Sequence, residues 1–95
     1  MEPVARKLGT LRTLTLLSRA YCHLCDDMRA ALEPLAARHG VDIVELDVDA
    51  DAALEERYGV RVPVLLLGTP ENGAELCHYT LDHASVMRAL AENAG

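Results

Sequence analysis

The sequence predicts an α/β fold of one domain, with the element order strand, helix, strand, helix, strand, strand, helix. Two apolar runs of strand type, residues 13–18 and 41–48, are separated by a segment with helical periodicity, as two parallel neighbouring strands require. Two further runs, residues 64–67 and 75–79, are joined by a short segment rich in Gly, Pro and Asn and are expected to pair antiparallel. We therefore expect a four-stranded mixed sheet with helices on both faces.

Length, charge and composition restrict the class of protein. The chain has 95 residues, enough for one domain, and 51% of them are hydrophobic although Phe and Trp are absent. The net charge of −6 argues against nucleic acid as the main partner. No run approaches the ~20 apolar residues of a membrane span, and three cysteines without an export signal favour a reducing compartment. We expect a cytoplasmic monomer with no membrane partner, built from a flexible N-terminal tail (1–10) and a single domain (11–95).

The first strand and the first helix follow that tail. Residues 13–18 are too apolar for a half-exposed edge strand and are expected at the centre of the sheet. Pro34 falls inside the helix that follows, where the missing backbone donor is expected to kink it, and Gly40 is the expected end. The apolar face of this helix runs at helical spacing through about residue 39 and comprises Leu24, Met28, Leu32, Leu35 and Ala36.

The second strand, residues 41–48, leads into a short helix. Asp49 or Asp51 is expected to cap a helix over residues 52–58, with Gly59 as its C-terminal stop. Acidic residues without any basic one run from residue 42 to residue 56. This run is either a solvated face or a docking surface for a basic partner.

The last third of the chain contains a strand-entry proline and a capped helix. Pro63 precedes the third strand, and because proline cannot donate a ladder hydrogen bond it belongs at an edge, a strand start or a special turn. The last helix is expected to begin at Asp82 as N-cap, with Leu81 and Val86 placed for a hydrophobic staple.

Cys22 and Cys25 stand at the first strand–helix junction with C-x-x-C spacing. Helix residues three apart share a face at roughly 5–6 Å, which lies within the Cα separation of a disulfide. Cys22 is at the helix start, where unpaired N–H groups and the positive end of the dipole stabilise a thiolate. Cys25, one turn in, suits the role of a resolving thiol. Half of a zinc site, or an inert structural pair, is the alternative.

The element order, with C-x-x-C at that junction and Val62-Pro63 before the third strand, resembles the thioredoxin superfamily in its glutaredoxin-type βαβαββα form. The resemblance extends over roughly residues 11–93. Glutaredoxins usually have a basic residue three positions before the first cysteine, and Arg19 is similar in this respect. The short second helix and the few residues before the first strand also resemble glutaredoxins. Thioredoxins carry a buried Asp and a Trp where this chain has Leu16 and Tyr21.

Glutaredoxins hold the γ-glutamyl end of glutathione on a GG-x-D pattern, which this chain replaces with Tyr79-Thr80-Leu81-Asp82. The chain is therefore similar to short bacterial glutaredoxin-like C-x-x-C proteins that lack this motif. The resemblance implies that Pro63 is cis and packs against the cysteines, that the Val62 backbone pairs with the bound thiol substrate, and that Asp82 remains from the glutathione site. It further implies protein or small-molecule disulfides as partners, glutathione as a possible co-substrate, and no bound cofactor.

In this fold Arg19 and Arg61 are expected to flank the cysteine loop. Positive charge lowers the pKa of a thiol and attracts an anionic tripeptide thiol. Lowering the pKa of Cys22 by two units would require about 2.7 kcal/mol from the helix end, the arginines and His23 together. Each arginine has the alternative of a solvated surface charge. His23 either adds charge when protonated or points to water, and Tyr21 is expected to be a packing or rim residue of the site.

Two functional hypotheses follow. The first is a dithiol glutaredoxin-like thiol–disulfide oxidoreductase of cell redox homeostasis, in which Cys22 attacks a disulfide and Cys25 resolves the mixed disulfide. The second is a metal-binding or metal-carrier module, because C-x-x-C after a first strand also binds soft metals. His78 and His83 beside Cys77 are expected to be ordinary surface or core residues rather than metal ligands. Cys77 is expected to be a buried small hydrophobic residue, with a third redox thiol as the alternative.

Overall fold

The structure, a computed structural model, describes residues 13–71 and 73–92. The predicted tail, residues 1–10, lies outside the described residues. Two 3₁₀ turns, η1 (Val48–Ala50) and η2 (Gly59–Arg61), flank helix α3. The helices and strands are β1 (Thr13–Ser18), α2 (His23–His39), β2 (Asp42–Asp47), α3 (Ala52–Tyr58), β3 (Val64–Leu67), β4 (Ala74–His78) and α4 (His83–Glu92). None of the helices in the described part of the chain is long and apolar enough to cross a membrane.

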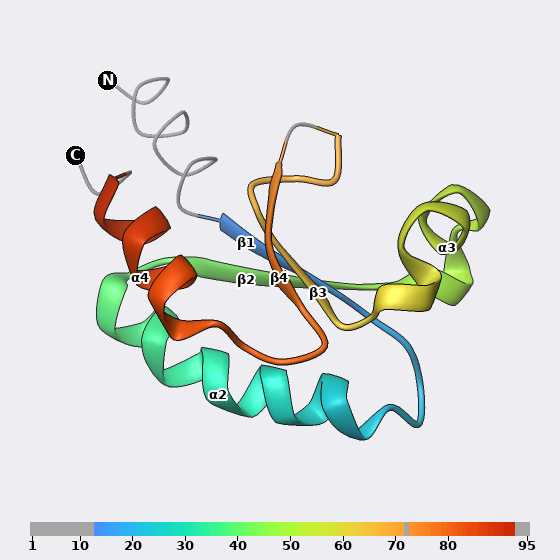
Figure 1. The fold of residues 1–95 in the computed structure, drawn as a ribbon, viewed down its shortest axis with the longest axis horizontal. Coiled ribbons are helices and arrows are strands. Elements are labelled where there is room, and N and C mark those ends of the chain that lie inside the picture. Colours follow the sequence, from blue (N-terminus) through green and yellow to red (C-terminus); the bar gives the residue numbers. More distant parts are fainter. Residues whose placement is uncertain (1–12, 72, 93–95) are drawn as a thin grey trace.

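The four strands form one mixed sheet in the order β2-β1-β3-β4 (Figure 1). β1 pairs parallel with β2 and antiparallel with β3, and β3 pairs antiparallel with β4. β1 is central, as its continuous apolar run predicts, and its last five residues are buried. The predicted α/β order and mixed sheet are therefore confirmed.

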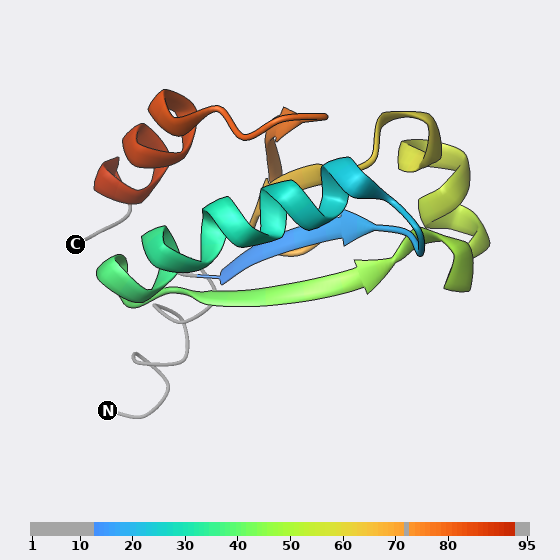
Figure 2. The ribbon, with the colours of Figure 1, turned by 90° about the horizontal axis from the view of Figure 1, so that it is seen from below.

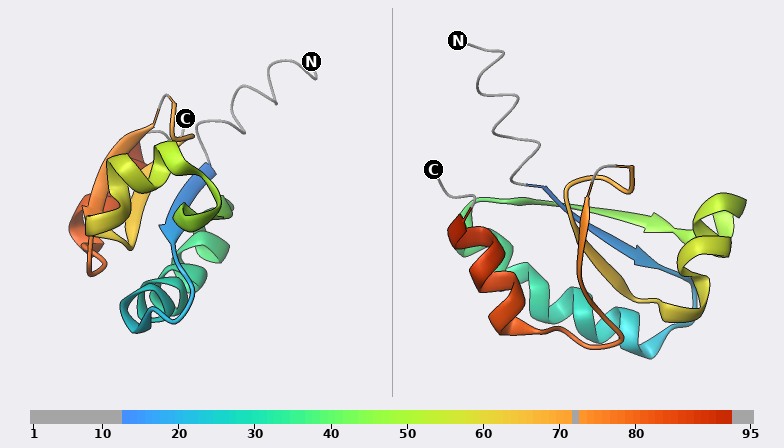
Figure 3. Two further views of the ribbon diagram at one scale, coloured as in Figure 1. Left: turned by 90° about the vertical axis from the view of Figure 1, so that its right-hand side faces the viewer. Right: turned by 45° about the horizontal axis from the view of Figure 1, so that its top comes forward.

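Helices cover both faces of the sheet, and the alternation of side chains along β1 explains how. Leu14 and Leu16 point to one face, where α2 and α4 lie side by side (Figure 2). Leu17 points to the other face, where α3 packs, and Figure 3 shows α2 and α3 on opposite sides of β1. Because successive residues of a strand point to opposite faces, one short strand supplies both cores.

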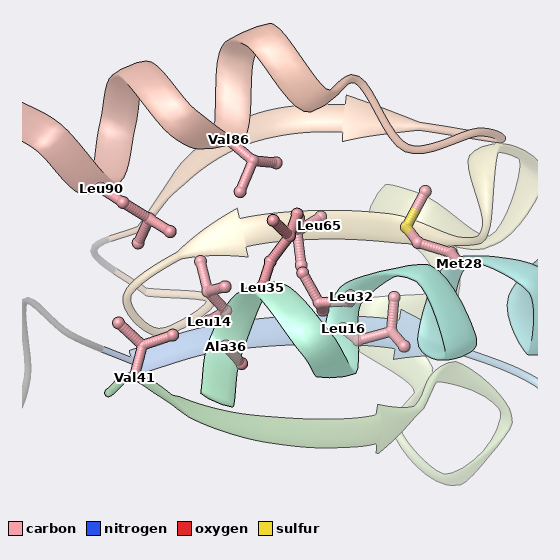
Figure 4. Close-up of a cluster of buried hydrophobic side chains, with 10 residues drawn as sticks. All are labelled: Leu14, Leu16, Met28, Leu32, Leu35, Ala36, Val41, Leu65, Val86 and Leu90. Carbon is pink, nitrogen blue, oxygen red and sulfur yellow. The ribbon is translucent and has the colours of Figure 1, made fainter. Parts of the chain in front are cut away.

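The larger core lies between the sheet and the pair α2 and α4 (Figure 4). Each fully buried leucine there contributes about 1.5–3 kcal/mol relative to an exposed one. Its members come from β1, α2, β3, α4 and the residue just before β2, and they are Leu14, Leu16, Met28, Leu32, Leu35, Ala36, Val41, Leu65, Val86 and Leu90. This core holds α2, and with it the cysteine-bearing turn, against the sheet.

The caps of α2 and α3 stand where the sequence predicted them. α2 continues through Pro34 and ends at Gly40, whose left-handed backbone (φ 65°) suits glycine. Asp51 caps α3, with its side chain accepting from the N–H groups of the next turn. Gly59 is the C-cap residue that ends α3 after Tyr58, as predicted. Its backbone stays right-handed (φ −52°, ψ −37°), and the chain continues into the η2 turn.

Two strands differ slightly from their predicted bounds, for local reasons. β2 begins at Asp42 because the N–H of Val41 donates to the carbonyl of Ala36 and closes the end of α2. It ends before Val48, which starts η1. β4 spans Ala74–His78 and stops before Tyr79, whose φ of 67° leaves the extended region.

Candidate functional site

The cysteine pair lies where β1 passes into α2. Cys22 and Cys25 form a disulfide with a Cα–Cα separation of 5.2 Å. Cys22 is the N-cap residue of α2, and its Sγ accepts a hydrogen bond from the backbone N–H of Cys25 at 3.1 Å. Cys25 has 0% exposure, whereas Cys22 is partly exposed. Solvent and any large partner therefore reach Cys22 and not Cys25.

Pro63 belongs to the same edge of the sheet as the cysteines. The antiparallel pair Leu17–Val64 sets the start of β3 opposite the end of β1, from which the chain runs to Cys22. The Val62–Pro63 peptide bond is cis, Pro63 is buried, and Val62 is half-buried. The Pro63 carbonyl accepts a hydrogen bond from the N–H of Tyr79 at 2.9 Å, which ties the end of β4 to this edge.

Arg19 contacts acidic groups on the α3 side of the sheet. Its Nη2 lies 3.2 Å from Oε2 of Glu55 and 3.6 Å from Oδ1 of Asp49, and it donates to the carbonyl of Gly59 at 3.4 Å. A guanidinium shared among such oxygens has less net charge to offer a thiolate or an anionic ligand.

Arg61 is also paired. Its Nη2 donates to Oε1 of Glu75 on β4 at 2.9 Å, and its guanidinium stacks 5.5 Å from the ring centre of Tyr58. The two arginines predicted to flank the cysteine loop thus both have carboxylate partners in the fold.

Tyr21 and His23 surround Cys22 on the outside. Tyr21 is fully exposed and has a left-handed backbone (φ 57°), a conformation uncommon for a residue other than glycine. His23 is the first residue of α2 and is also exposed. Both predicted site residues therefore sit at the rim of the cysteine turn and not in a core.

A polar cluster that the sequence did not reveal lies on the β2 side of the cysteine turn. Arg29 of α2 donates from Nε to Oε1 of Glu45 at 2.7 Å and from Nη2 to its other oxygen, and it also reaches Asp26 at 2.9 Å. The hydroxyl of Ser18 donates to Glu45 at 2.7 Å. The hydrogen bonds to Glu45 and Asp26 raise the pKa of Arg29. The hydrogen bonds from Arg29, and to a smaller extent the one from Ser18, hold the pKa of Glu45 below its usual value. Of these contacts, only the Asp26–Arg29 pair has a spacing (i, i+3 on one helix) that the sequence alone shows.

This cluster borders an open pocket of about 310 Å³, lined by Ser18, Arg19, Ala20, Tyr21, Asp26, Arg29, Glu45 and Asp47. Arg29 is paired with Asp26 and Glu45 within this lining, and Arg19 is paired with Asp49 and Glu55 outside it. The arrangement stabilises the β1–α2 turn in which Cys22 is held.

A second pocket, of about 240 Å³, lies on the opposite side of the cysteine turn, between α2 and the chain that links β4 to α4. We call it the α2–α4 pocket. It is lined by Leu24, Asp27, Met28, Ala31, Tyr79, Thr80, Leu81 and His83. No local pattern predicted it, because its two walls are some fifty residues apart in sequence.

Asp82, predicted to remain from a glutathione site, caps α4. Its carboxylate accepts from the N–H of Ser85 at 3.2 Å and from the hydroxyl of Ser85 at 2.9 Å, and these bonds lower the pKa of Asp82. The predicted N-cap is confirmed, and the acceptor atoms face the helix of Asp82 itself.

Cys77 lies in β4, half-buried opposite Leu65, and burial raises the pKa of its thiol. It is a free thiol and takes no part in the Cys22–Cys25 disulfide. Over residues 13–71 and 73–92, no group of three or more His, Cys, Asp or Glu side chains is arranged to hold a metal ion.

Comparison with known proteins places these features in a family. The model of a family described as glutaredoxin-like domain (DUF836) matches residues 13–91. An uncharacterized protein of Mycobacterium tuberculosis is 30% identical over 83 residues, which cover 82% of this chain and 81% of that protein.

Solved structures agree with the fold. Protein Ne2328 from Nitrosomonas europaea has a TM-score of 0.72 and 34% identity, covering 81% of this chain and 88% of that one. Protein XcR50 from X. campestris has a TM-score of 0.59 and 39% identity, covering 83% and 96%. Thioredoxin 1 from Thermosipho africanus has a TM-score of 0.60 at 17% identity, covering 84% and 91%, and this likeness shows the thioredoxin fold alone.

Proposed function

The chain belongs to the family of glutaredoxin-like domains (DUF836), and we propose on that basis that it is a dithiol thiol–disulfide oxidoreductase. In this proposal Cys22 is the nucleophile, Cys25 is the resolving thiol, and the protein serves redox homeostasis in the cytoplasm. The substrates are protein or small-molecule disulfides, and a thiol such as glutathione restores the reduced pair.

The reaction consists of two thiol–disulfide exchanges. The Cys22 thiolate attacks one sulfur of the substrate disulfide, forming a mixed disulfide and releasing the first substrate thiolate, which takes up a proton. The Cys25 thiol loses its proton and attacks Cys22 Sγ, which forms the Cys22–Cys25 disulfide and releases the second substrate thiol. Two electrons have then passed from the protein to the substrate, and an external thiol returns them.

The observation that carries the proposal is the unequal environment of two bonded cysteines at a helix start. Cys22 is partly exposed and its Sγ accepts the N–H of Cys25, so the environment favours its thiolate. Cys25 is fully buried but lies within bonding distance of Cys22. Such a pair provides an accessible attacking sulfur and a shielded sulfur that only a bound mixed disulfide would meet.

The proposal is tested by following the reduction of a small uncharged disulfide with reduced protein. We expect Cys22→Ser to abolish the reaction and Cys25→Ser to stop it at a mixed disulfide on Cys22, detectable by mass. Cys77→Ser is the matched control and should react like the unaltered protein. Trapping on Cys25 in place of Cys22, or activity that survives Cys22→Ser, would contradict the assigned roles.

The metal-carrier hypothesis requires Cys22 and Cys25 to remain free thiolates that bind a metal, whereas the oxidoreductase joins them in a disulfide. Metal analysis and thiol counting on one preparation distinguish the two functions. A stoichiometric soft metal together with thiols that resist oxidation would favour the carrier and count against the oxidoreductase.

A further inference from the structure

We infer that the α2–α4 pocket is the specificity site of the proposed oxidoreductase, and that it receives an apolar side chain of a polypeptide disulfide whose neighbouring residues are basic. The inference rests on the proposed function, because it assigns the substrate class of the same cysteine pair. It excludes glutathione as the preferred disulfide partner.

The pocket lies beside the turn that carries the cysteine pair, and its lining comes from the first turns of α2 and from residues 79–83. Leu24, one of its lining residues, lies between Cys22 and Cys25 in the chain, and it is 43% exposed. On the other wall, the N–H of Tyr79 is bonded to the carbonyl of Pro63. A polypeptide whose cysteine is joined to Cys22 therefore passes the mouth of this pocket with the residue next to that cysteine.

The size of the pocket fits one side chain. Its volume is about 240 Å³, below the range of about 300–1,000 Å³ that small-molecule sites usually have. A dry cavity of about 150 Å³ already accepts benzene. A leucine or phenylalanine side chain therefore fits.

The lining residues of the pocket favour an apolar occupant. Leu24, Ala31 and Leu81 supply aliphatic surface from both walls. This is the surface that gains free energy when an apolar side chain displaces water from it.

The charge around the pocket favours cationic neighbours of that side chain. Asp27 lines the pocket, and Asp82 stands between the lining residues Leu81 and His83. The two arginines predicted for anion binding, Arg19 and Arg61, are engaged by Glu55 and Glu75. With a net charge of −6 on the chain, an anionic tripeptide is repelled and a basic peptide is attracted.

Tyr79 holds the pocket wall in place. Besides its N–H bond to Pro63, its hydroxyl donates to the carbonyl of Val60 at 3.0 Å, so the side chain spans from the end of β4 to the η2 turn. Its φ of 67° is a conformation that glycine adopts without strain and tyrosine does not. A tyrosine held there by two hydrogen bonds narrows a place that a glycine would leave open.

The experiment measures the rate at which reduced protein releases a coloured thiolate from a set of mixed disulfides. The first probe is a pentapeptide with leucine on both sides of the cysteine and lysine at both ends. The others replace leucine by serine, replace lysine by glutamate, or replace the peptide by glutathione. A mixed disulfide with mercaptoethanol is the reference, and every rate constant is expressed as a ratio to it.

We expect the leucine–lysine peptide to react at least about tenfold faster than the serine peptide, since one buried apolar group gives 10- to 200-fold discrimination. The glutamate peptide and glutathione should both react more slowly than the leucine–lysine peptide, and the difference from the glutamate peptide should shrink at high salt. Equal ratios for the leucine and serine peptides, or a glutathione ratio as high as that of the leucine–lysine peptide, would overturn the inference.

Two pairs of variants locate the effect. Ala31→Leu fills the pocket and should remove the preference for leucine over serine, whereas Ala30→Leu, on the exposed side of α2, should keep it. Asp27→Lys should reverse the preference between lysine and glutamate peptides, whereas Glu33→Lys makes the same charge change outside the pocket and should not reverse it. If Ala31→Leu fails to fold, the comparison of Asp27→Lys with Glu33→Lys still tests the inference.

The two proposals fail in different ways. If the mercaptoethanol reference itself does not react, the oxidoreductase assignment is wrong. If the reference reacts but the rate ratios are the same for all peptides, and do not change in the variants at Ala31 and Asp27, the oxidoreductase assignment stands and the pocket assignment is wrong.

Discussion

The backbone N–H of Cys25 donates to Sγ of Cys22 at 3.1 Å, across the first turn of α2. When the disulfide is reduced, an N–H aimed at this sulfur stabilises negative charge on it, as a capping group does at any helix N-terminus. Cys25 has no equivalent position, because it lies one turn inside the helix with 0% exposure.

We expect the Cys22 thiol of the reduced protein to titrate well below the ordinary cysteine value of about 8.5. Alkylation as a function of pH, with peptide mapping to separate the cysteines, measures this. Cys22 should react first and Cys25 last, while Cys77 should react only at higher pH because burial raises its pKa. A Cys22 that titrates like free cysteine would remove the electrostatic basis of the mechanism.

The protein purified under air is expected to contain a Cys22–Cys25 disulfide and no stoichiometric metal. Intact mass with and without reductant should differ by two hydrogens, and the mapped bridge should exclude Cys77. The Cys77→Ser variant serves as the control, since it should give the same difference.

Glutathione is expected to bind weakly to the Cys25→Ser variant, in a salt-sensitive way. Tyr79 and Thr80 crowd the place where glycines would admit the ligand to the backbone, and Asp82 is bonded to Ser85. Losing one or two charge-assisted hydrogen bonds of about 1.5–3 kcal/mol each weakens binding by one to three orders of magnitude. Titration followed by backbone amide shifts measures this affinity.

Replacing both crowding residues, Tyr79→Gly with Thr80→Gly, should strengthen glutathione binding by about tenfold or more, because glycine adopts the φ of 67° freely. The same replacement at Thr69, outside this region, is the matched control. Tight glutathione binding by the protein without the glycine replacements, with amide shifts centred on residues 80–83, would show that the missing glycines do not matter.

The Arg29–Glu45 pair should make stability depend on pH in one direction. The folded state holds the pKa of Glu45 below its ordinary value of 4.5, chiefly through the Arg29 hydrogen bonds. The stabilisation is therefore fully present above that value and is lost as the pH falls through the lower, folded-state pKa. Arg29→Met should cost about 1 kcal/mol or less near neutral pH, because both side chains are about one-third exposed.

Urea unfolding at neutral and at acidic pH measures this dependence. The difference between the unaltered protein and Arg29→Met should shrink in acid, while Arg38→Met, on an exposed part of the same helix, should show no such change. A difference that grows in acid would mean that the sign of the Glu45 contribution is reversed.

Much of the fold was determined by local sequence. The apolar run of β1, the periodic face of α2 and the caps at Gly40, Asp51 and Asp82 each act through neighbours within a few residues. For such features the backbone hydrogen bonds and the burial pattern are set by spacing, so the sequence predicted the element order and the place of the C-x-x-C pair.

The surroundings of the cysteines were decided by tertiary structure. Arg19, just after β1, meets Glu55 of α3, and Arg61 of η2 meets Glu75 of β4, only because the fold brings these separate elements together. The α2–α4 pocket likewise depends on how α4 packs beside α2 over the sheet. Charge pairing and cavity shape depend on distances in space between residues far apart in the chain, and spacing along the sequence does not encode those distances.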